Sequence, residues 1–427
     1  MPEPLNIIFG ILLDFLKLSW WLWLFLILLP IFQSLYLHWR QEEFKHSKAF
    51  DMVMMEIKMP REINKNPKAM EQILMAIHSL RNAPGGVKEK WINGEVTIWF
   101  SLEIVSLGGN IHFYIRFPRV HKSLIETVFF SYYSDINLIE VDDYTQNFPQ
   151  NIIDLQEKGY EIDGAEIVLA KEEAYPIKIY SDFESSDENK RYDPISQFLE
   201  VLGRCNKEEI FGIQFLIAPA GSDWNKKYEK LVGDLREKKN KQQSQNKSDT
   251  SSGSSLTPTS GEMDILKKVE ENLSKPAFYT LIRLIYLAPK TLFNDFCMKG
   301  IILAFNQYSD PNLNSFKQNV KIIKKVNIPN PPKRILYSKA SFLYNYIHRE
   351  CPPETFMGKL ITSNIFRWNF HSKRFLMTTQ CLATLFHPPT SMVTTTPHLE
   401  KMQSRKAGPP PGLSIFGEEK EIEKFYE

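Results

Sequence analysis

Cysteine is scarce in this chain. Only four of the 427 residues are cysteines, Cys205, Cys297, Cys351 and Cys381. They lie far apart and form neither a CxxC pair nor a spacing typical of a zinc site, so the sequence predicts neither a disulfide framework nor a metal knuckle. We interpret them as reduced, partly buried thiols, and we expect no metal site and no cofactor.

Sequence motifs of the common enzyme classes are also missing. The nine histidines are scattered, and the patterns HExxH, GxSxG, GxGxxG and GxxxxGK[ST] do not occur. These absences argue against a zinc protease, a serine hydrolase and a phosphate-loop NTPase. We therefore expect no catalytic residues and predict that the protein is not an enzyme.

Disorder along the whole chain is excluded by its composition. Apolar residues make up 43% of the chain and aromatic residues 13%, well above the values of disordered proteins. A chain of 427 residues also exceeds the usual size of one domain. We expect two or three folded units, each with its own core.

One long apolar run lies near the N-terminus. Leu18–Leu37 carries no formal charge, and at about 1.5 Å per residue a helix of this length crosses the roughly 30 Å of bilayer hydrocarbon. A cleaved signal peptide is the alternative, but the run is too long for one, and Asp14 and Lys17 interrupt its start. We predict that residues 1–40 form a transmembrane anchor.

The residues around this run predict its orientation. Arg40, Lys45 and Lys48 follow it, whereas the short N-terminal side offers Lys17 and the amino terminus. Positive charge favours the cytoplasmic side, so we expect a single-pass protein of the cell membrane with the bulk of the chain in the cytoplasm. Aromatic residues typical of membrane interfaces lie at both ends of the run: Trp20, Trp21, Trp23, Tyr36 and Trp39.

The segment Trp99–Pro118 predicts a β-hairpin. Apolar and polar residues alternate in two runs, and Gly108, Gly109 and Asn110 lie between them. Glycine accepts the positive φ of a tight turn. A phosphate-binding loop is the alternative interpretation of the two glycines, but it needs a longer glycine pattern.

The hairpin lies in the middle of a β-α-β-β-α-β pattern over residues 48–150. The other predicted elements are a strand at 50–58, a helix at 66–80, a helix at 118–133 and a strand at 136–141. This order is that of a ferredoxin-like unit, in which two helices pack on one face of an antiparallel sheet. The other face would meet water or a partner.

A second pass through the same order is predicted over residues 160–320. Its elements are a strand at 165–180, helices at 194–202, 223–238, 263–273 and 292–305, and strands at 209–218 and 278–288. Residues 239–261 are polar and rich in serine, so we expect a disordered insertion at the tip of a helical hairpin. The predicted fold class is α+β, with one transmembrane helix and two ferredoxin-like units, the second interrupted.

The C-terminal part is predicted to be helical and then extended. Residues 321–387 contain a helix at 337–348, irregular or strand structure at 361–370, and a short helix capped by Thr378 or Thr379 that ends near Phe386. Residues 388–427 are a proline-rich strap with an acidic tail, typical of a tether or of a segment laid over another surface.

Two clusters have both a chemical and a structural interpretation. Glu140, Asp142 and Asp143 follow the last strand of the first unit and could hold a hard cation. A solvated strand end is the commoner arrangement, and we favour it. His112 lies in the hairpin on the face opposite Phe113, and we interpret it as a sheet residue rather than a ligand.

Basic residues are concentrated in the back half. Residues 276–412 contain 18 Lys and Arg against 5 Asp and Glu, a net +13, which leaves −11 for the rest. Such a segment is either solvated or attracts nucleic acid, anionic lipid or an acidic partner. Smaller basic groups lie at Arg116, Arg119, His121 and Lys122, near Tyr114 and Phe117, and at Lys321, Lys324, Lys325, Lys333 and Arg334.

Two motifs carry a resemblance to a known family. FSLEIVSLGGNIHFYIRFP (Phe100–Pro118), preceded by a membrane span, and CLATLFHPPTSMVTTTPHLEKMQSRKAGPPPGL (Cys381–Leu413) resemble the N-terminal region of membrane-anchored type IV secretion and conjugative DNA-transfer ATPases of the FtsK/HerA class. Where that family has Asn-Thr-Glu-Glu before the Leu-Ala-Thr-Leu helix, this chain has Thr379, Gln380 and Cys381. Walker A and Walker B residues are absent, so ATP hydrolysis is not carried over.

The resemblance implies a membrane-anchored, non-catalytic scaffold or docking subunit for a separate cytoplasmic ATPase of the FtsK/HerA class. Its expected partners are the lipid bilayer and that ATPase, with DNA and further copies of the chain as additional candidates. The alternative function is a membrane-proximal module that binds nucleic acid through residues 276–412.

Overall fold

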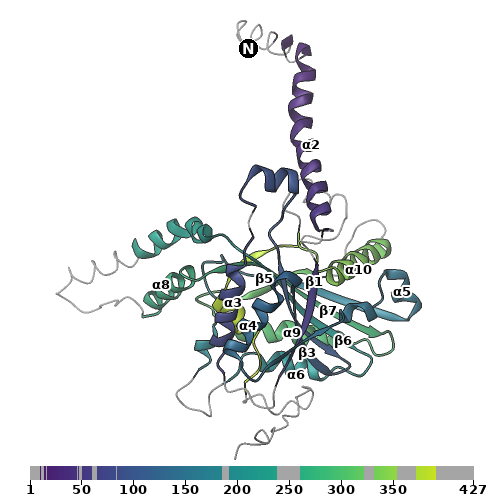
Figure 1. The fold of residues 1–427 in the computed structure, drawn as a ribbon, viewed down its shortest axis with the longest axis vertical. Helices are drawn as coiled ribbons and strands as arrows, with labels where there is room; N and C mark the ends of the chain where they lie inside the picture. Colours follow the sequence, from purple (N-terminus) through teal and green to yellow (C-terminus); the bar gives the residue numbers. More distant parts are fainter. Residues whose placement is uncertain are drawn as a thin grey trace, which may run out of the picture.

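The computed structural model describes residues 10, 14–15, 17–45, 47, 51–59, 65–82, 84–184, 192–237, 260–321, 331–352 and 372–390. In these residues the chain is a mixed α+β structure, built on one antiparallel sheet of nine strands with helices on both faces. A long N-terminal helix projects from this body (Figure 1).

The first seven strands lie at or near positions expected from the sequence, whereas β8 and β9 were not predicted. They are β1 (Met52–Lys58), β2 (Phe100–Leu107), β3 (Asn110–Pro118), β4 (Asn137–Val141), β5 (Tyr160–Leu169), β6 (Ile210–Pro219), β7 (Ala277–Pro289), β8 (Phe316–Lys321) and β9 (Phe375–Thr378). The hairpin of β2 and β3 is confirmed, and Gly108 and Gly109 have φ values of +62° and +88° in its turn. The predicted strand at 165–180 is wrong in its bounds, because β5 ends at Leu169.

The strand order is β4-β1-β3-β2-β6-β7-β5-β8, and β9 pairs with the start of β7. Two ferredoxin-like units were expected, and that arrangement is not confirmed. β2 pairs with β6 along its whole length, from Phe100 opposite Ile217 to Leu107 opposite Ile210, so the two halves form one continuous sheet. The overall order is not that of a ferredoxin-like sheet. Pairing the two strands satisfies backbone groups that two free sheet edges would expose.

One face of the sheet is covered by helices from both halves of the chain. These are α3 (Lys68–Ser79), α4 (Lys122–Tyr132), α6 (Ser196–Gly203), α9 (Asp295–Ala304) and α12 (Thr379–Leu385). Their apolar side chains form the main core with the inward residues of the strands, among them Leu102 and Phe113. Thr378 is the N-cap residue of α12 by position, but its hydroxyl donates to Asn272 instead of capping the helix.

The opposite face of the sheet is also covered, whereas the sequence predicted contact with water or a partner. Here α10 (Pro331–Ile347) packs on the sheet, and α5 (Ile152–Glu157) lies at the side against α10 and β5 (Figure 1). Val105 of β2 and Ile285 of β7 meet Phe342 and Tyr346 of α10 in a second core. Both faces of β2, β6 and β7 are therefore buried.

A helical hairpin lies beside the sheet. It consists of η7 (Ser222–Tyr228), a helix that continues to residue 237, and α8 (Ser260–Leu273), and Trp224 and Val269 pack between them. The predicted insertion at 239–261 lies outside the described residues except for the start of α8. The region at 361–370 and the strap after Thr390 also lie outside them.

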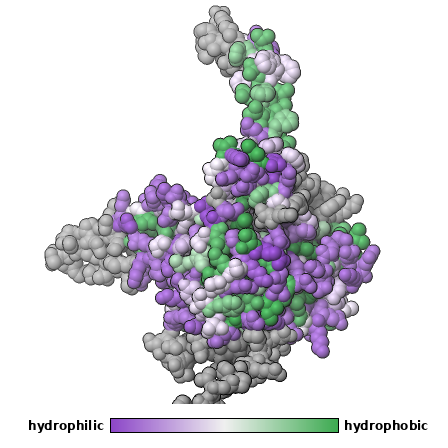
Figure 2. All heavy atoms as spheres, in the orientation of Figure 1, coloured by the Kyte–Doolittle hydropathy of each residue, from purple (hydrophilic) through white to green (hydrophobic). Residues whose placement is uncertain are grey.

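The N-terminal helix α2 (Trp20–Lys45) is long and apolar enough to span a membrane. None of its apolar window is buried against the rest of the chain. Figure 2 shows hydrophobic atoms along the projecting helix, in contrast to the mostly hydrophilic face of the body.

Candidate functional site

The last turns of α2 attach it to the body. The guanidinium of Arg40 donates from Nε to the carbonyl oxygen of Ile92, at 2.8 Å. Lys45 lies 3.5 Å from Glu350, which follows α10. Phe44 packs against a buried cluster that contains Trp99. The helix is thus held by a hydrogen bond, an ion pair and apolar packing.

A short helix, η2 (Lys88–Asn93), lies beside the base of α2 (Figure 1). Gly94 ends η2 with a φ of +67°, and a Cβ atom at this position would lie 2.3 Å from the carbonyl oxygen of Arg40. Only glycine fits so close to α2 in this conformation. We call residues 84–99 the collar, because η2 within this segment contacts the last turns of α2.

The collar and α2 both expose apolar side chains. Val87 is 77% exposed and Ile92 56% exposed on the collar, and Trp39 is 60% exposed on α2. Lys88, Glu89 and Lys90 lie between Val87 and Ile92 in the sequence. Exposed apolar side chains beside cations are typical of a surface that meets the headgroup layer of a membrane.

A row of polar residues crosses the sheet under α10. Each member lies opposite the next on the neighbouring strand, so all of them point to the same face. In sheet order they are Glu56, Tyr114, Glu103, Gln214, Arg283 and Glu166. Five of them are nearly fully buried polar or charged groups, so the row needs internal partners.

Arg349, just after α10, supplies the main partner for the first half of the row. Its guanidinium donates to both carboxylate oxygens of Glu103, at 3.0 and 3.2 Å, and also to Asp143. Arg349 itself is completely buried. Arg283 has the same role in the second half, where it donates to Glu166 at 3.1 Å and to the carbonyl oxygen of Glu350 at 2.5 Å.

These contacts connect the anchor helix to the centre of the sheet. Lys45 of α2 pairs with Glu350, and the neighbouring Arg349 pairs with Glu103 on β2. Trp99 of the collar donates to the carbonyl oxygen of Arg349, at 3.0 Å. A displacement of α2 would therefore also move Arg349 and Glu350, the residues that follow α10.

A separate buried pair, His387 and Asp193, fixes the segment after α12. His387 directs Nε2 to Asp193 at 2.9 Å and Nδ1 to the carbonyl oxygen of Ala383 at 2.8 Å. Both ring nitrogens thus face an oxygen atom. Burial alone would raise the pKa of Asp193, but His387 and Thr390 lower it to about 2. These contacts hold the segment after α12 against the residues that precede α6.

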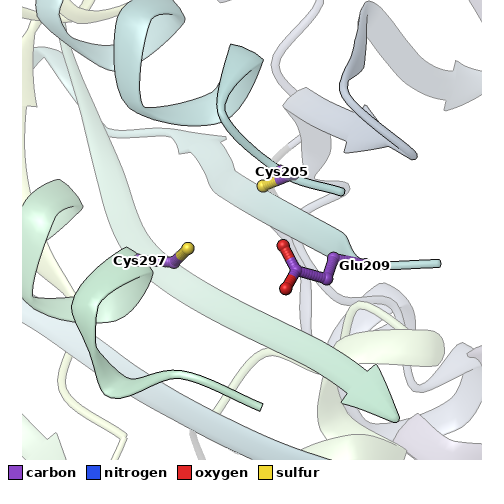
Figure 3. A group of neighbouring side chains, drawn as sticks. All are labelled: Cys205, Glu209 and Cys297. Carbon is purple, nitrogen blue, oxygen red and sulfur yellow. The ribbon is translucent and has the colours of Figure 1, made fainter. Parts of the chain in front are cut away.

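Cys205, Glu209 and Cys297 form a cluster that the sequence did not predict. Their ligand atoms all lie within 4.8 Å of one another, and the side chains converge from three elements (Figure 3). Cys205 follows α6, Glu209 precedes β6, and Cys297 lies on α9. The only local signal was the spacing Cys205-x3-Glu209, and the third member lies far along the chain.

The clusters considered from the sequence have other partners. Glu140 pairs with Arg119 at 2.7 Å and with Lys122 at 2.5 Å, whereas Asp143 turns to Arg349. The carboxylates of Glu140 and Asp143 therefore point to different partners and do not form one cation site. His112 lies 2.7 Å from Glu56 on the neighbouring strand, which confirms it as a sheet residue.

The basic stretch after the hairpin does not offer a stacking surface. Tyr114 and Phe117 are buried in the two cores. Arg116 is half-buried, and burial lowers its pKa to about 10. Of the other basic group, Lys324 and Lys325 lie outside the described residues, and the side chains of Lys321, Lys333 and Arg334 are not described.

Comparison with known proteins gives a family but no activity. No curated protein matches the chain. A family described as a domain of unknown function (DUF8128) matches residues 35–401, which include the last turns of α2, the collar, the whole sheet and both buried ion-pair networks. The chain therefore belongs to the DUF8128 family.

Proposed function

We propose that the protein is a non-catalytic, membrane-anchored docking subunit for a cytoplasmic DNA-translocating ATPase of the FtsK/HerA class. The observation that carries the membrane part of this proposal is α2, an apolar helix that projects from the body with its apolar window unburied. Water-exposed apolar surface of this size is costly for a soluble protein, and a bilayer would remove that cost.

The attachment of α2 supports a rigid platform rather than a flexible tether. Arg40, Phe44 and Lys45 all contact the body. The exposed residues of the collar would lie in the headgroup layer beside Tyr36 and Trp39. A body fixed in this way presents the same surface to the cytoplasm at all times, as a docking subunit requires.

We also propose that the sheet consists of two ferredoxin-like halves, and its strand order supports this. Numbered within the first half, the strand order is fourth, first, third, second. The second half repeats this order in reverse, as a mirror across the pairing of β2 with β6. This symmetry is the arrangement expected of two β-α-β-β-α-β units joined through the edge strands of their sheets.

The orientation proposed here places the body in the cytoplasm. Arg40 and Lys45 lie at the body end of α2, and the positive-inside rule places that end on the cytoplasmic side. The proline-rich residues after Thr390 would then lie along the ATPase, as the resemblance to the conjugative family implies.

Crosslinking in the native membrane tests the ATPase as partner. After solubilisation, the full chain should capture an ATPase of the FtsK/HerA class. A variant that ends at Thr390 keeps α2 and the sheet and is the matched control, and it should remain in the membrane but lose most of the ATPase. Equal recovery of other membrane proteins and no ATPase from the full chain would contradict the proposal.

The alternative function is nucleic-acid binding, supported by the net +13 of residues 276–412. Phosphate contacts predict an affinity that decreases steeply as salt increases. A gel-shift titration over a salt series distinguishes it from docking, because a pure docking subunit shows no such salt-dependent complex.

A further inference from the structure

The cluster of Cys205, Glu209 and Cys297 is not used by the proposed function, and its chemistry is specific. Two thiols and one carboxylate meet on the face of the sheet that α6 and α9 cover, and each of the three residues is less than a tenth exposed. Thiolates prefer Zn²⁺ and other soft or borderline cations, and a carboxylate is a common additional ligand of Zn²⁺.

Glu209 also lacks the partner that a buried carboxylate usually has. In the described part of the chain no lysine, arginine or histidine forms an ion pair with it, whereas buried Glu103 and Glu166 each pair with an arginine. Its hydrogen bonds come from neutral donors, Asn206 and Tyr286. A buried carboxylate without a cation is costly, and a bound cation would compensate its charge.

The neighbouring groups fit a metal ligand set. Asn206 donates its backbone N–H and its side-chain amide to Glu209, at 2.9 and 3.1 Å, which fixes the carboxylate. Tyr286 donates to the same carboxylate at 3.2 Å. Such outer contacts orient the ligands in metal sites.

We propose that Cys205, Glu209 and Cys297 bind a divalent cation of the zinc type. Both thiols lose their protons to solvent when the ion binds, so the affinity should decrease as the pH decreases. With three protein ligands, a tetrahedral ion keeps its fourth position for water. The site lies between α6, β6 and α9 and would connect the two helices to the second half of the sheet.

Cobalt titration of the full chain in detergent tests this site. After treatment with a chelator and its removal, Co²⁺ should bind at about one equivalent per chain and give the charge-transfer absorption of a thiolate ligand, and Zn²⁺ should displace it. Cys205→Ser and Cys297→Ser should each lose this absorption, and Glu209→Gln should weaken binding. Tyr286→Phe should weaken it by about 10- to 100-fold.

Cys381→Ser is the matched control, because Cys381 is an equally buried thiol on α12. It should bind Co²⁺ as the wild type does. A second measurement uses the unmodified chain, so it does not depend on the folding of any variant: Zn²⁺ should protect Cys205 and Cys297 from alkylation and leave Cys351 unchanged. Binding without thiolate absorption, or a disulfide between the two thiols in freshly reduced protein, would overturn the proposal.

Discussion

Arg349 is the residue that pairs with the buried carboxylate at the centre of the sheet. It is fully buried and neutralises Glu103 and Asp143, which come from two different segments. It also has a φ of +52°, an uncommon conformation for a side chain of this size. The buried ion pairs of Arg349 and Arg283 neutralise the carboxylates of Glu103 and Glu166 in the polar row that crosses the sheet.

Replacing Arg349 with methionine should therefore be strongly destabilising. The change removes the cation that pairs with the buried Glu103 and the partly buried Asp143, and we expect a loss of about 3–5 kcal/mol in the free energy of unfolding. Denaturant unfolding in detergent measures it. Arg204→Met is the control, because Arg204 pairs with Glu200 on the surface and should cost less than about 1 kcal/mol. Equal effects would show that the network does not hold the fold.

Asp193 predicts a pH dependence with a definite sign. Its pKa in the folded protein is about 2, below the ordinary value of about 3.9. A lowered pKa contributes stability that is complete above the ordinary value and is lost as the pH decreases toward about 2. The stability difference between wild type and Asp193→Asn should thus be constant near neutral pH and decrease below about pH 4.

Thermal or denaturant unfolding at several pH values measures this difference. Asp223→Asn is the control, because Asp223 pairs only with Lys226 on the surface. It should change stability little at any pH in this range. A difference for Asp193→Asn that increased at low pH would contradict the assignment of the ion pair with His387.

At the scale of elements, the attachment of the collar to α2 has a direct test. Gly94→Ala places a Cβ atom 2.3 Å from the carbonyl oxygen of Arg40, whereas Gly159→Ala has a similar φ of +70° and meets nothing within 4 Å. Both variants strain the backbone, but only the first displaces the collar. We expect faster cleavage by protease in residues 84–99 for Gly94→Ala alone. Equal cleavage of both variants would show that the contact with Arg40 has no role.

The elements that the sequence predicted well are those with local signals. The hairpin has alternation on both sides of Gly108 and Gly109, and α3 has apolar residues at helical spacing, so neighbouring residues determine both. The pairing of β2 with β6 and of β9 with β7 joins segments that are distant in the chain, and no local pattern indicates it. The order β-α-β-β-α-β could be predicted because each element has a local pattern. The assembly of the elements into one sheet could not, because it depends on pairing between distant segments.

The cluster around Glu209 was missed for a related reason. Cys297 lies on α9, and only the fold brings it to Cys205 and Glu209. The buried partners of Glu103 were also hidden, because Arg349 follows a helix that could have packed elsewhere.

At the scale of the whole molecule, α2 is the element that is long and apolar enough to hold the protein in a membrane. Leu24→Lys combined with Leu28→Lys places two charges in its exposed apolar surface, at a cost of about 2.5–3.5 kcal/mol each in a bilayer. We expect this variant to leave the membrane fraction in part or in full. Leu303→Lys changes an exposed leucine of α9 on the body and should leave the distribution unchanged. Membrane fractionation with quantitative blotting measures both.

The most direct test of the account is alkaline extraction of membranes from cells that produce the full chain. The account predicts that the protein stays in the pellet after alkaline washing and is released only by detergent. Recovery of the intact chain in the supernatant after the alkaline wash would contradict the membrane anchor, and with it the proposed docking function.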